Sequence, residues 1–330
     1  MDVKTDGTTV WFGERFSLTF QRTLRIPDDG MTYPLPPGLG YFPINHVADF
    51  KKKVPSEWVR HGGVFIPMYQ REALWISFNG AYWKPNAVKI GIGKINAVSG
   101  KSWTQVILKR KQDYLVCPPQ PWLDGINVGK GYIRQFVAMP LGQGYTVEGQ
   151  LSGKEEWGGV QVMVFEPKPG KFPDQPTIEY YEPCMFPCSP KPTGMGICAG
   201  GKMKQEIYPD PHGFDTWDTE NYGRLFVHIV NSEMYREITG MAPPQTPINA
   251  KVYTNCGLPW FDLYGGELGD LSGAKEFAKV KTVKETDQEK GLEGAQDDTP
   301  VDIPPEDVLN LFTSNIKSNV RRVIDQSRNK

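Results

Sequence analysis

Short runs with the alternating apolar pattern of β-strands, separated by proline- and glycine-rich stretches, leave this chain few folds to choose from. The 330 residues include 35 glycines and 29 prolines. Residues 33–43 hold four prolines, and because proline has no backbone N–H, this stretch is neither a helix nor an inner strand. Long loops between strands favour antiparallel sheets over strand–helix–strand units. We therefore expect a mainly β fold, in the β-rich part of the α+β class.

The strand-type runs are residues 17–26, 64–68, 73–78, 88–98, 132–139, 145–151, 159–165, 203–208 and 223–231. Glycine commonly ends helices, and it follows both helix candidates, which are 47–60 before Gly62-Gly63 and 232–239 before Gly240. Along 88–98, Lys89, Gly91 and Gly93 share one face of the expected strand. Glycines on that face leave room for another layer or another protomer.

A motif of proline, tryptophan, an apolar residue and aspartate occurs twice, with Pro121, Trp122 and Asp124 answered by Pro259, Trp260 and Asp262. Two other pairs follow in the same order at nearly the same spacing: 68–72 with 203–206, and 98–100 with 238–240. We interpret this as a tandem duplication that gives two pseudo-symmetric antiparallel β-sheet domains, at 16–130 and 131–266. The alternative is that β-proteins reuse proline, glycine and tryptophan at turns. Two fused similar units suit a protomer that builds lattices.

The tryptophans of this motif allow two interpretations. An aromatic face beside a carboxylate suits carbohydrate, so Trp122 and Trp260 could be sugar-stacking platforms. Their equivalent places in two copies favour a structural role instead, in which each ring plugs the base of a sheet.

The composition changes near residue 265, and we expect a C-terminal extension there. Residues 267–303 are charged and poor in aromatic residues, which predicts a linker. Residues 304–330 then predict an amphipathic helix with prolines and acidic residues at its start. Its apolar stripe consists of Val308, Leu311, Phe312, Ile316, Val320 and Val323. A lone helix of this length is marginal in water, so it has to dock on something.

Charge and hydropathy exclude several classes of partner. The chain has 37 basic and 38 acidic residues and a net charge of −1, which gives no reason to expect nucleic acid and does not oppose self-association. No apolar run approaches the length of a membrane-spanning helix. Residues 1–15 form a polar N-terminal arm without the features of a secretory signal, although a targeting peptide could have been removed before Met1.

The richest polar cluster consists of Asp210, His212, Asp215 and Asp218. These side chains could ligate a cation, or His212 could act as a base with an aspartate. Their spacing matches neither an EF-hand nor a zinc-protease motif. Asp-Pro and His-Gly are also ordinary turn sequences, and we favour that interpretation.

Five cysteines, an odd number, argue against a full disulfide framework. Cys184, Cys188 and Cys198 lack the fourth ligand and the CxxC pair of a zinc site; one disulfide is possible, and free buried cysteines are favoured. The other histidines, His46, His61 and His228, lie in separate elements, and no nucleophile, phosphate-loop or dinucleotide motif is present. We therefore predict no catalytic residue, no cofactor and no metal.

Four stretches of the sequence resemble known proteins, and they are FQRTLRIPDDGMTYPLPPGLGYFPI, GGVFIPMYQREALW, QDYLVCPPQPWLDGIN and QEIYPDPHGFDTWD. They resemble a group of uncharacterised bacterial proteins. The duplicated β-unit followed by a linker and a terminal helix also resembles the pyrenoid shell proteins (PyShell) of diatoms, over about 16–266. This resemblance concerns architecture, so no functional residue is carried over. It implies a place in the pyrenoid of the chloroplast stroma after removal of a transit peptide, and a structural role beside Rubisco; without it, a cytoplasmic protein is expected.

We expect a non-enzymatic protein that self-assembles into a sheet, tube or shell, with the C-terminal segment reaching over a neighbouring copy as a strap. Such a shell would enclose the Rubisco condensate and aid carbon fixation. The alternative is a soluble enzyme or carbohydrate-binding protein with a site around Asp210 to Asp218. A third hypothesis is that the terminal helix binds another protein, such as Rubisco.

Overall fold

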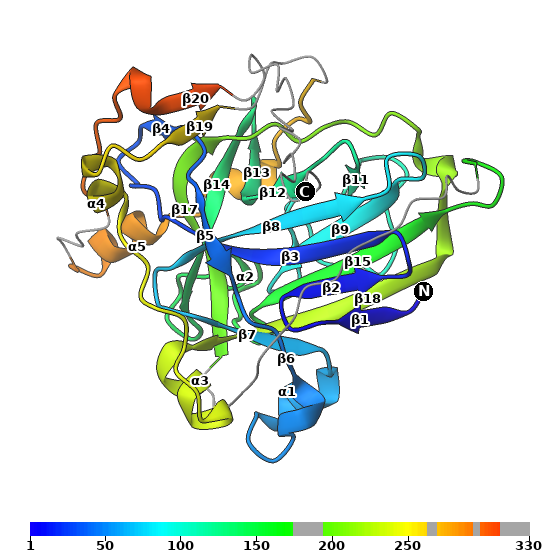
Figure 1. Ribbon diagram of the computed structural model, residues 1–330, viewed down its shortest axis with the longest axis horizontal. Coiled ribbons are helices and arrows are strands. Elements are labelled where there is room, and N and C mark those ends of the chain that lie inside the picture. The colour runs from blue at the N-terminus through cyan, green and yellow to red at the C-terminus, as the bar shows by residue number, and fades with distance from the viewer. Residues whose placement is uncertain (174–193, 263–268, 293–297, 311–330) are drawn as a thin grey trace, which may run out of the picture.

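The computed structural model describes residues 1–173, 194–262, 269–292 and 298–310 (Figure 1). The fold is mainly β, as the sequence predicts. Within these residues, 17 strands form one connected sheet that is mostly antiparallel. The strands of this sheet are β1 (Val3–Thr5), β2 (Thr9–Phe12), β3 (Phe16–Thr23), β4 (Thr32–Tyr33), β5 (Gly38–Tyr41), β6 (Asn45–His46), β7 (Val64–Met68), β8 (Ala73–Gly80), β9 (Asn86–Ile92), β10 (Ile95–Asn96), β11 (Leu115–Cys117), β12 (Trp122–Leu123), β13 (Gly125–Gly129), β14 (Tyr132–Pro140), β15 (Val160–Pro167), β17 (Gly194–Lys204) and β18 (Trp217–Asn231).

A second, two-stranded parallel sheet pairs β19 (Trp260–Asp262) with β20 (Val308–Asn310). The α-helices are α1 (Ser56–His61), α2 (Val147–Ser152), α3 (Ser232–Thr239), α4 (Ala250–Asn255) and α5 (Val283–Glu289). Short 3-10 helices are η1 (Val47–Phe50), η2 (Phe214–Thr216), η3 (Lys275–Lys279) and η5 (Pro305–Asp307). No helix in the described part of the chain is long and apolar enough to cross a membrane.

Strands from the two predicted copies pair with one another. β8 pairs with β14 and β9 with β15, both antiparallel, while β7 pairs with β18 and β4 with β17, both parallel. Residues 16–130 and 131–266 therefore contribute to one sheet instead of two separate ones. The structure does not show the pseudo-symmetry, and the duplication stays a prediction.

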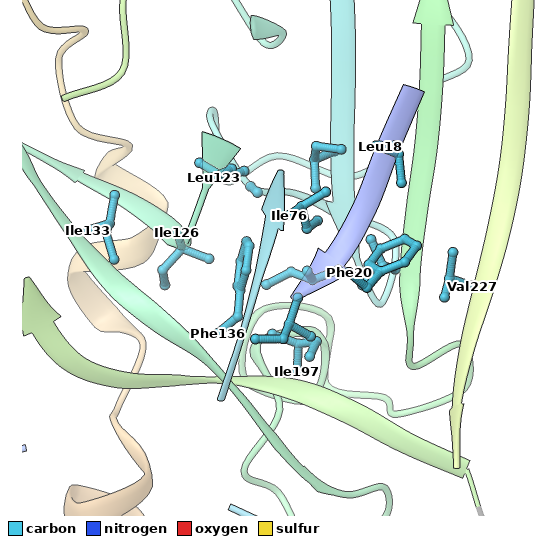
Figure 2. Packing of buried hydrophobic residues seen from close by; sticks show 14 of the residues in the cluster. Leu18, Phe20, Ile76, Leu123, Ile126, Ile133, Phe136, Ile197 and Val227 are labelled. Atoms are coloured by element: carbon cyan, nitrogen blue, oxygen red, sulfur yellow. The ribbon is translucent and has the colours of Figure 1, made fainter. Parts of the chain in front are cut away.

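The main core lies between these interleaved strands (Figure 2). The core side chains labelled in Figure 2 come from β3, β8, β12, β13, β14, β17 and β18, and they are Leu18, Phe20, Ile76, Leu123, Ile126, Ile133, Phe136, Ile197 and Val227. Every one of them is at most 2% exposed. At roughly 25 cal/mol per Å² of apolar surface, burial of these side chains is the main favourable contribution to folding.

Local sequence signals explain which predicted elements form. The predicted strand 64–68 is β7, and the predicted helix 232–239 is α3. Asn231 caps α3 by accepting from the Met234 N–H at 2.8 Å, and Gly240 ends it at a φ of 83°.

Two predicted elements are interrupted. The single helix expected over 47–60 is split into η1 and α1, because Pro55 cannot donate the backbone hydrogen bond of a continuous helix. The strand expected over 88–98 is a hairpin of β9 and β10. Gly93 and Lys94 form its turn at φ values of 53° and 61°.

The strand predicted over 145–151 is wrong, because that stretch contains the helix α2. The Thr146 hydroxyl caps the helix by accepting from the Gly149 N–H at 3.0 Å, and Gly153 ends it at a φ of 77°. Both flanking signals suit a helix better than the alternation of Tyr145, Val147 and Leu151 suits a strand.

The prediction of a linker over 267–303 is also wrong for the described residues. η3 and α5 lie within it, and Phe277, Val280 and Val283 are buried against the sheet. Val308 belongs to β20, so it is not part of a helix. The other members of the predicted stripe, Leu311, Phe312, Ile316, Val320 and Val323, lie outside the described residues.

Candidate functional site

The two tryptophans of the repeated motif have different surroundings. Trp260 is fully buried against Tyr33, and its indole N–H donates to the Thr254 hydroxyl at 3.1 Å. Trp122 is half-buried and meets Trp75 edge to face, with ring centroids 5.8 Å apart. Trp260 therefore has no face open to a sugar.

The aspartates of the motif fasten two adjacent residues at the end of β17. The Gln205 amide donates to Asp124 Oδ2 at 2.7 Å and accepts from the Asp124 backbone N–H at 2.9 Å. Asp262 forms an ion pair with Lys204 at 3.0 Å. Burial raises the pKa of Asp124 to about 7. Both carboxylates therefore have partners that stabilise the fold.

The carbonyl oxygens of the two motif prolines are also used internally. Pro121 accepts from the Phe78 backbone N–H at 2.9 Å, and Pro259 accepts from the Tyr253 hydroxyl at 2.9 Å. All the motif residues thus have structural contacts.

Asp210 is bonded within its own turn and to the sheet. One oxygen accepts from the Tyr114 hydroxyl at 2.6 Å and from the Trp217 indole N–H at 2.9 Å. The other oxygen accepts from the His212 backbone N–H at 2.8 Å. The imidazole of His212 meets Phe172 edge to face at 5.0 Å between ring centroids.

The remaining acids of this cluster point to other partners. Exposed Asp215 forms an ion pair with Lys109 at 3.2 Å, and Asp218 accepts from the backbone N–H groups of Glu220 and Asn221. Across the described ranges, no group of three or more histidine, cysteine or acidic side chains could hold a metal ion. Asp210 and Asp218 thus bond to nearby backbone N–H groups, as aspartates in turns do.

Cys198 is a free, buried thiol whose pKa is raised by burial, so the reactive thiolate is disfavoured. Cys184 and Cys188 lie outside the described residues. The Thr5 hydroxyl and His46 Nε2 are 3.0 Å apart at the surface. His61 and His228, which come from separate elements, stack with ring centroids 6.0 Å apart.

The C-terminal segment, defined here as residues 269–292 and 298–310, is clamped to its own chain by buried charges. Asp298 forms ion pairs with Arg25 at 2.6 Å and with Arg71 at 3.1 Å. Asp287 forms an ion pair with Arg71 at 2.8 Å and accepts from the Tyr145 hydroxyl at 2.6 Å. Because both aspartates are almost fully buried, each depends on these partners.

The start of the C-terminal segment is held by backbone contacts. The carboxylate of Asp270 accepts from the N–H groups of Gly131 at 2.7 Å and Ile207 at 2.9 Å. A Cβ atom added to Gly129 would lie 2.4 Å from the Gly273 nitrogen, so the two backbones touch here only because residue 129 is glycine. The segment therefore packs on the sheet from its first described residues.

The C-terminal corner, defined as α4, β19 and β20, exposes apolar side chains. Figure 1 shows these three elements together at the upper left, with β20 in orange-red. The exposed apolar side chains on or beside these elements are 40% to 48% exposed and comprise Ile248, Val252, Leu258 and Leu309. One of these side chains, Leu309, belongs to the last described strand, β20.

Sequence reasoning missed the residues that clamp the C-terminal segment. Asp287 and Asp298 lie in a charged stretch where single acids carry no periodic signal. The apolar residues Phe277, Val280 and Val283 recur at intervals of three, and this spacing was the signal available for a segment that packs.

The comparisons with known proteins add no family: no family model matches the chain, and no curated protein or solved structure matches it either.

Proposed function

We propose that this protein is a structural protein that self-assembles into a sheet, tube or shell through its C-terminal end. The observation that carries the proposal is the C-terminal corner, whose elements α4, β19 and β20 expose apolar side chains on or beside them, among them Leu309 of β20. Exposed apolar groups that gather at one place are typical of protein–protein contacts. The occupant we propose for this surface is the apolar stripe within 311–330 of a second copy.

The clamp limits which residues can act as a strap. Ion pairs of Asp287 and Asp298 hold the C-terminal segment on its own body, and β20 pairs with β19. The part that we propose reaches a neighbour is therefore the sequence after Asn310. If they form the helix that the sequence predicts, these twenty residues would span about 30 Å at 1.5 Å per residue.

Charge and geometry support self-association. A net charge of −1 produces little long-range repulsion between copies. The corner and residues 311–330 are different parts of the chain, so a contact between them in two copies is head-to-tail and can propagate from copy to copy. We further propose that the assembly encloses a Rubisco condensate in a pyrenoid, which rests on the sequence resemblance and agrees with the mainly β fold.

The test is negative-stain electron microscopy of the full chain beside a chain truncated after Asn310. We expect sheets or tubes from the full chain and discrete particles from the truncated one. Truncation at this point keeps the clamp, so thermal unfolding of the two proteins should agree. A truncation after Gly273 is unsuitable, because it would remove Phe277 and expose core surface.

The Leu311→Asp, Phe312→Asp double variant is the matched test in the full chain. It should abolish assembly and leave the β circular-dichroism signal unchanged. Discrete particles from the unmodified chain, at every salt and protein concentration tried, would refute self-assembly. Assembly that persists in the truncated chain would refute the role of the C-terminal end.

A further inference from the structure

A groove of about 300 Å³ opens beside the end of α1, between the β9–β10 turn and β18. Its walls are aromatic and cationic, and the residues that the argument uses are His61, Lys94, Trp103, Gln105, Trp157 and Arg224. These residues come from separate segments of the chain, and no sequence motif contains them together.

Lys94 is the first of two cations in the groove that have no acidic partner. Its ammonium lies 4.8 Å from the ring centroid of Trp157 and 5.7 Å from that of Phe226. No carboxylate of the described residues forms an ion pair with it. Burial and the charge of Arg224 lower its pKa, so its positive charge is not compensated in the folded chain.

Arg224 is the second such cation. Its guanidinium donates to Gln105 Oε1 at 3.1 Å, and it has no ion pair with the part of the chain that the structure describes. The Gln105 amide orients the guanidinium without neutralising it. Lys94 and Arg224 thus present two positive charges to one groove.

The acids nearest the groove are engaged elsewhere. Both oxygens of Glu148 accept backbone N–H groups, those of Glu156 at 3.0 Å, Trp157 at 2.9 Å and Gly158 at 2.8 Å. The carboxylate of Glu156 pairs with Lys154 at 3.0 Å. Neither Glu148 nor Glu156 forms an ion pair with Lys94 or Arg224, so both cations are open to a negative group on a ligand.

Glu148 also gives the groove a fixed wall. Its three hydrogen bonds hold the loop that carries Trp157, whose side chain is 37% exposed. On the same side, the His61 ring stacks on Trp157 at 4.8 Å and on Phe226 at 5.1 Å between centroids. Stacked rings of this kind are rigid and hold their positions without a ligand.

The opposite wall is anchored by the second face of β9. The buried Lys89 ammonium donates to the Thr104 hydroxyl at 2.8 Å and the Val106 carbonyl at 2.5 Å, and it pairs with Asp113 at 2.7 Å. These bonds hold the loop that carries Trp103. A Cβ atom on Gly91 would lie 2.5 Å from the Trp103 ring. The small-residue face predicted from the sequence therefore accommodates this loop.

We propose that this groove binds a phosphorylated sugar, with its phosphate between Lys94 and Arg224 and its ring against the Trp103 and Trp157 walls. An ammonium and a guanidinium together suit a phosphate, since both donate charge-assisted hydrogen bonds. The volume lies at the low end of the range for ligand pockets, about 300–1,000 Å³, and it is large enough for one sugar ring.

Isothermal titration calorimetry of the full-length protein tests the ligand class with four probes: glucose 6-phosphate, glucose, inorganic phosphate and adenosine monophosphate. We expect glucose 6-phosphate to bind more tightly than phosphate, and glucose not to bind. Equal affinity for glucose 6-phosphate and phosphate would mean an adventitious ion only and would overturn the proposal. Tighter binding of adenosine monophosphate would overturn the sugar in favour of a nucleotide, and no binding of any probe would overturn the site.

Variants test the two cations. Lys94→Met and Arg224→Gln should each weaken glucose 6-phosphate by about tenfold or more, as expected when a charge-assisted contact is lost. Lys94→Arg should retain binding, and Lys4→Met, at an exposed lysine that pairs with Asp2, is the control for net charge. Matching thermal unfolding curves confirm that each variant folds. Unchanged affinity in Lys94→Met would overturn the assignment.

Discussion

The groove and the C-terminal corner are both positioned by buried charges, but they offer different chemistry to the outside. Lys89 with Asp113 anchors one wall of the groove, and Asp298 with Arg25 clamps the segment that ends at the corner. What remains exposed is cationic and aromatic in the groove and apolar at the corner. A buried ion pair thus holds each surface in place, although one surface is cationic and aromatic and the other is apolar.

If the two surfaces are independent, loss of one anchor should affect one surface and spare the other. Residues more than about 10 Å apart without shared partners usually contribute additively to stability. Substitutions at the two anchors therefore test whether the surfaces are independent.

The largest effect is expected for Lys89→Met. The lysine side chain is fully buried, so its removal leaves Asp113 buried without its ion partner, at a cost of about 3–5 kcal/mol in the free energy of unfolding. The loop with Trp103 should loosen, and glucose 6-phosphate should bind weakly or not at all. Urea denaturation and calorimetry measure the two effects. Assembly should persist in electron micrographs, and its loss would show that the two surfaces are coupled.

Asp298→Asn should have a smaller effect on stability, because the amide keeps the shape and some hydrogen bonds of the carboxylate. We expect a loss of about 2–3 kcal/mol in the free energy of unfolding, measured by urea denaturation, since the nearby arginines lose a charged partner. Limited proteolysis should cut the C-terminal segment faster, and assembly should weaken. Calorimetry should give unchanged binding in the groove; weaker binding there would contradict the separation of the surfaces.

Local signals made part of this fold predictable from the sequence. α3 has its capping Asn231 and its terminal Gly240 within one short stretch, and the apolar run of β7 has no competing pattern. The mainly β class follows from many such stretches. The helix α2 is harder to predict, because the alternation of apolar residues over 145–151 favours a strand while the cap at Thr146 favours a helix.

The other parts of the fold and the groove depend on tertiary contacts, which local sequence patterns do not predict. The burial of Phe277 depends on a sheet formed by residues far away in the chain, so its charged surroundings suggest a linker. Lys94 and Arg224 lie 130 residues apart in the numbering and meet only because β9 pairs with β15 and β15 with β18. The lattice contact proposed for 311–330 still rests on the apolar spacing in the sequence.

Asp124 lies in neither surface, and it provides the most general test, with the smallest expected effect for a change of one pH unit. Burial raises its pKa from 3.8 to about 7, so between these values the folded chain holds a proton that the unfolded chain releases. The free energy of unfolding should therefore fall as the pH rises through this window, by up to about 1.4 kcal/mol per pH unit. Asp124→Asn keeps a hydrogen-bonding group beside Gln205 and should flatten this part of the stability curve, measured by urea denaturation at several pH values. Binding and assembly at fixed pH should be unaffected, because neither surface uses this residue. An unchanged slope in the variant would assign the pH dependence to another group.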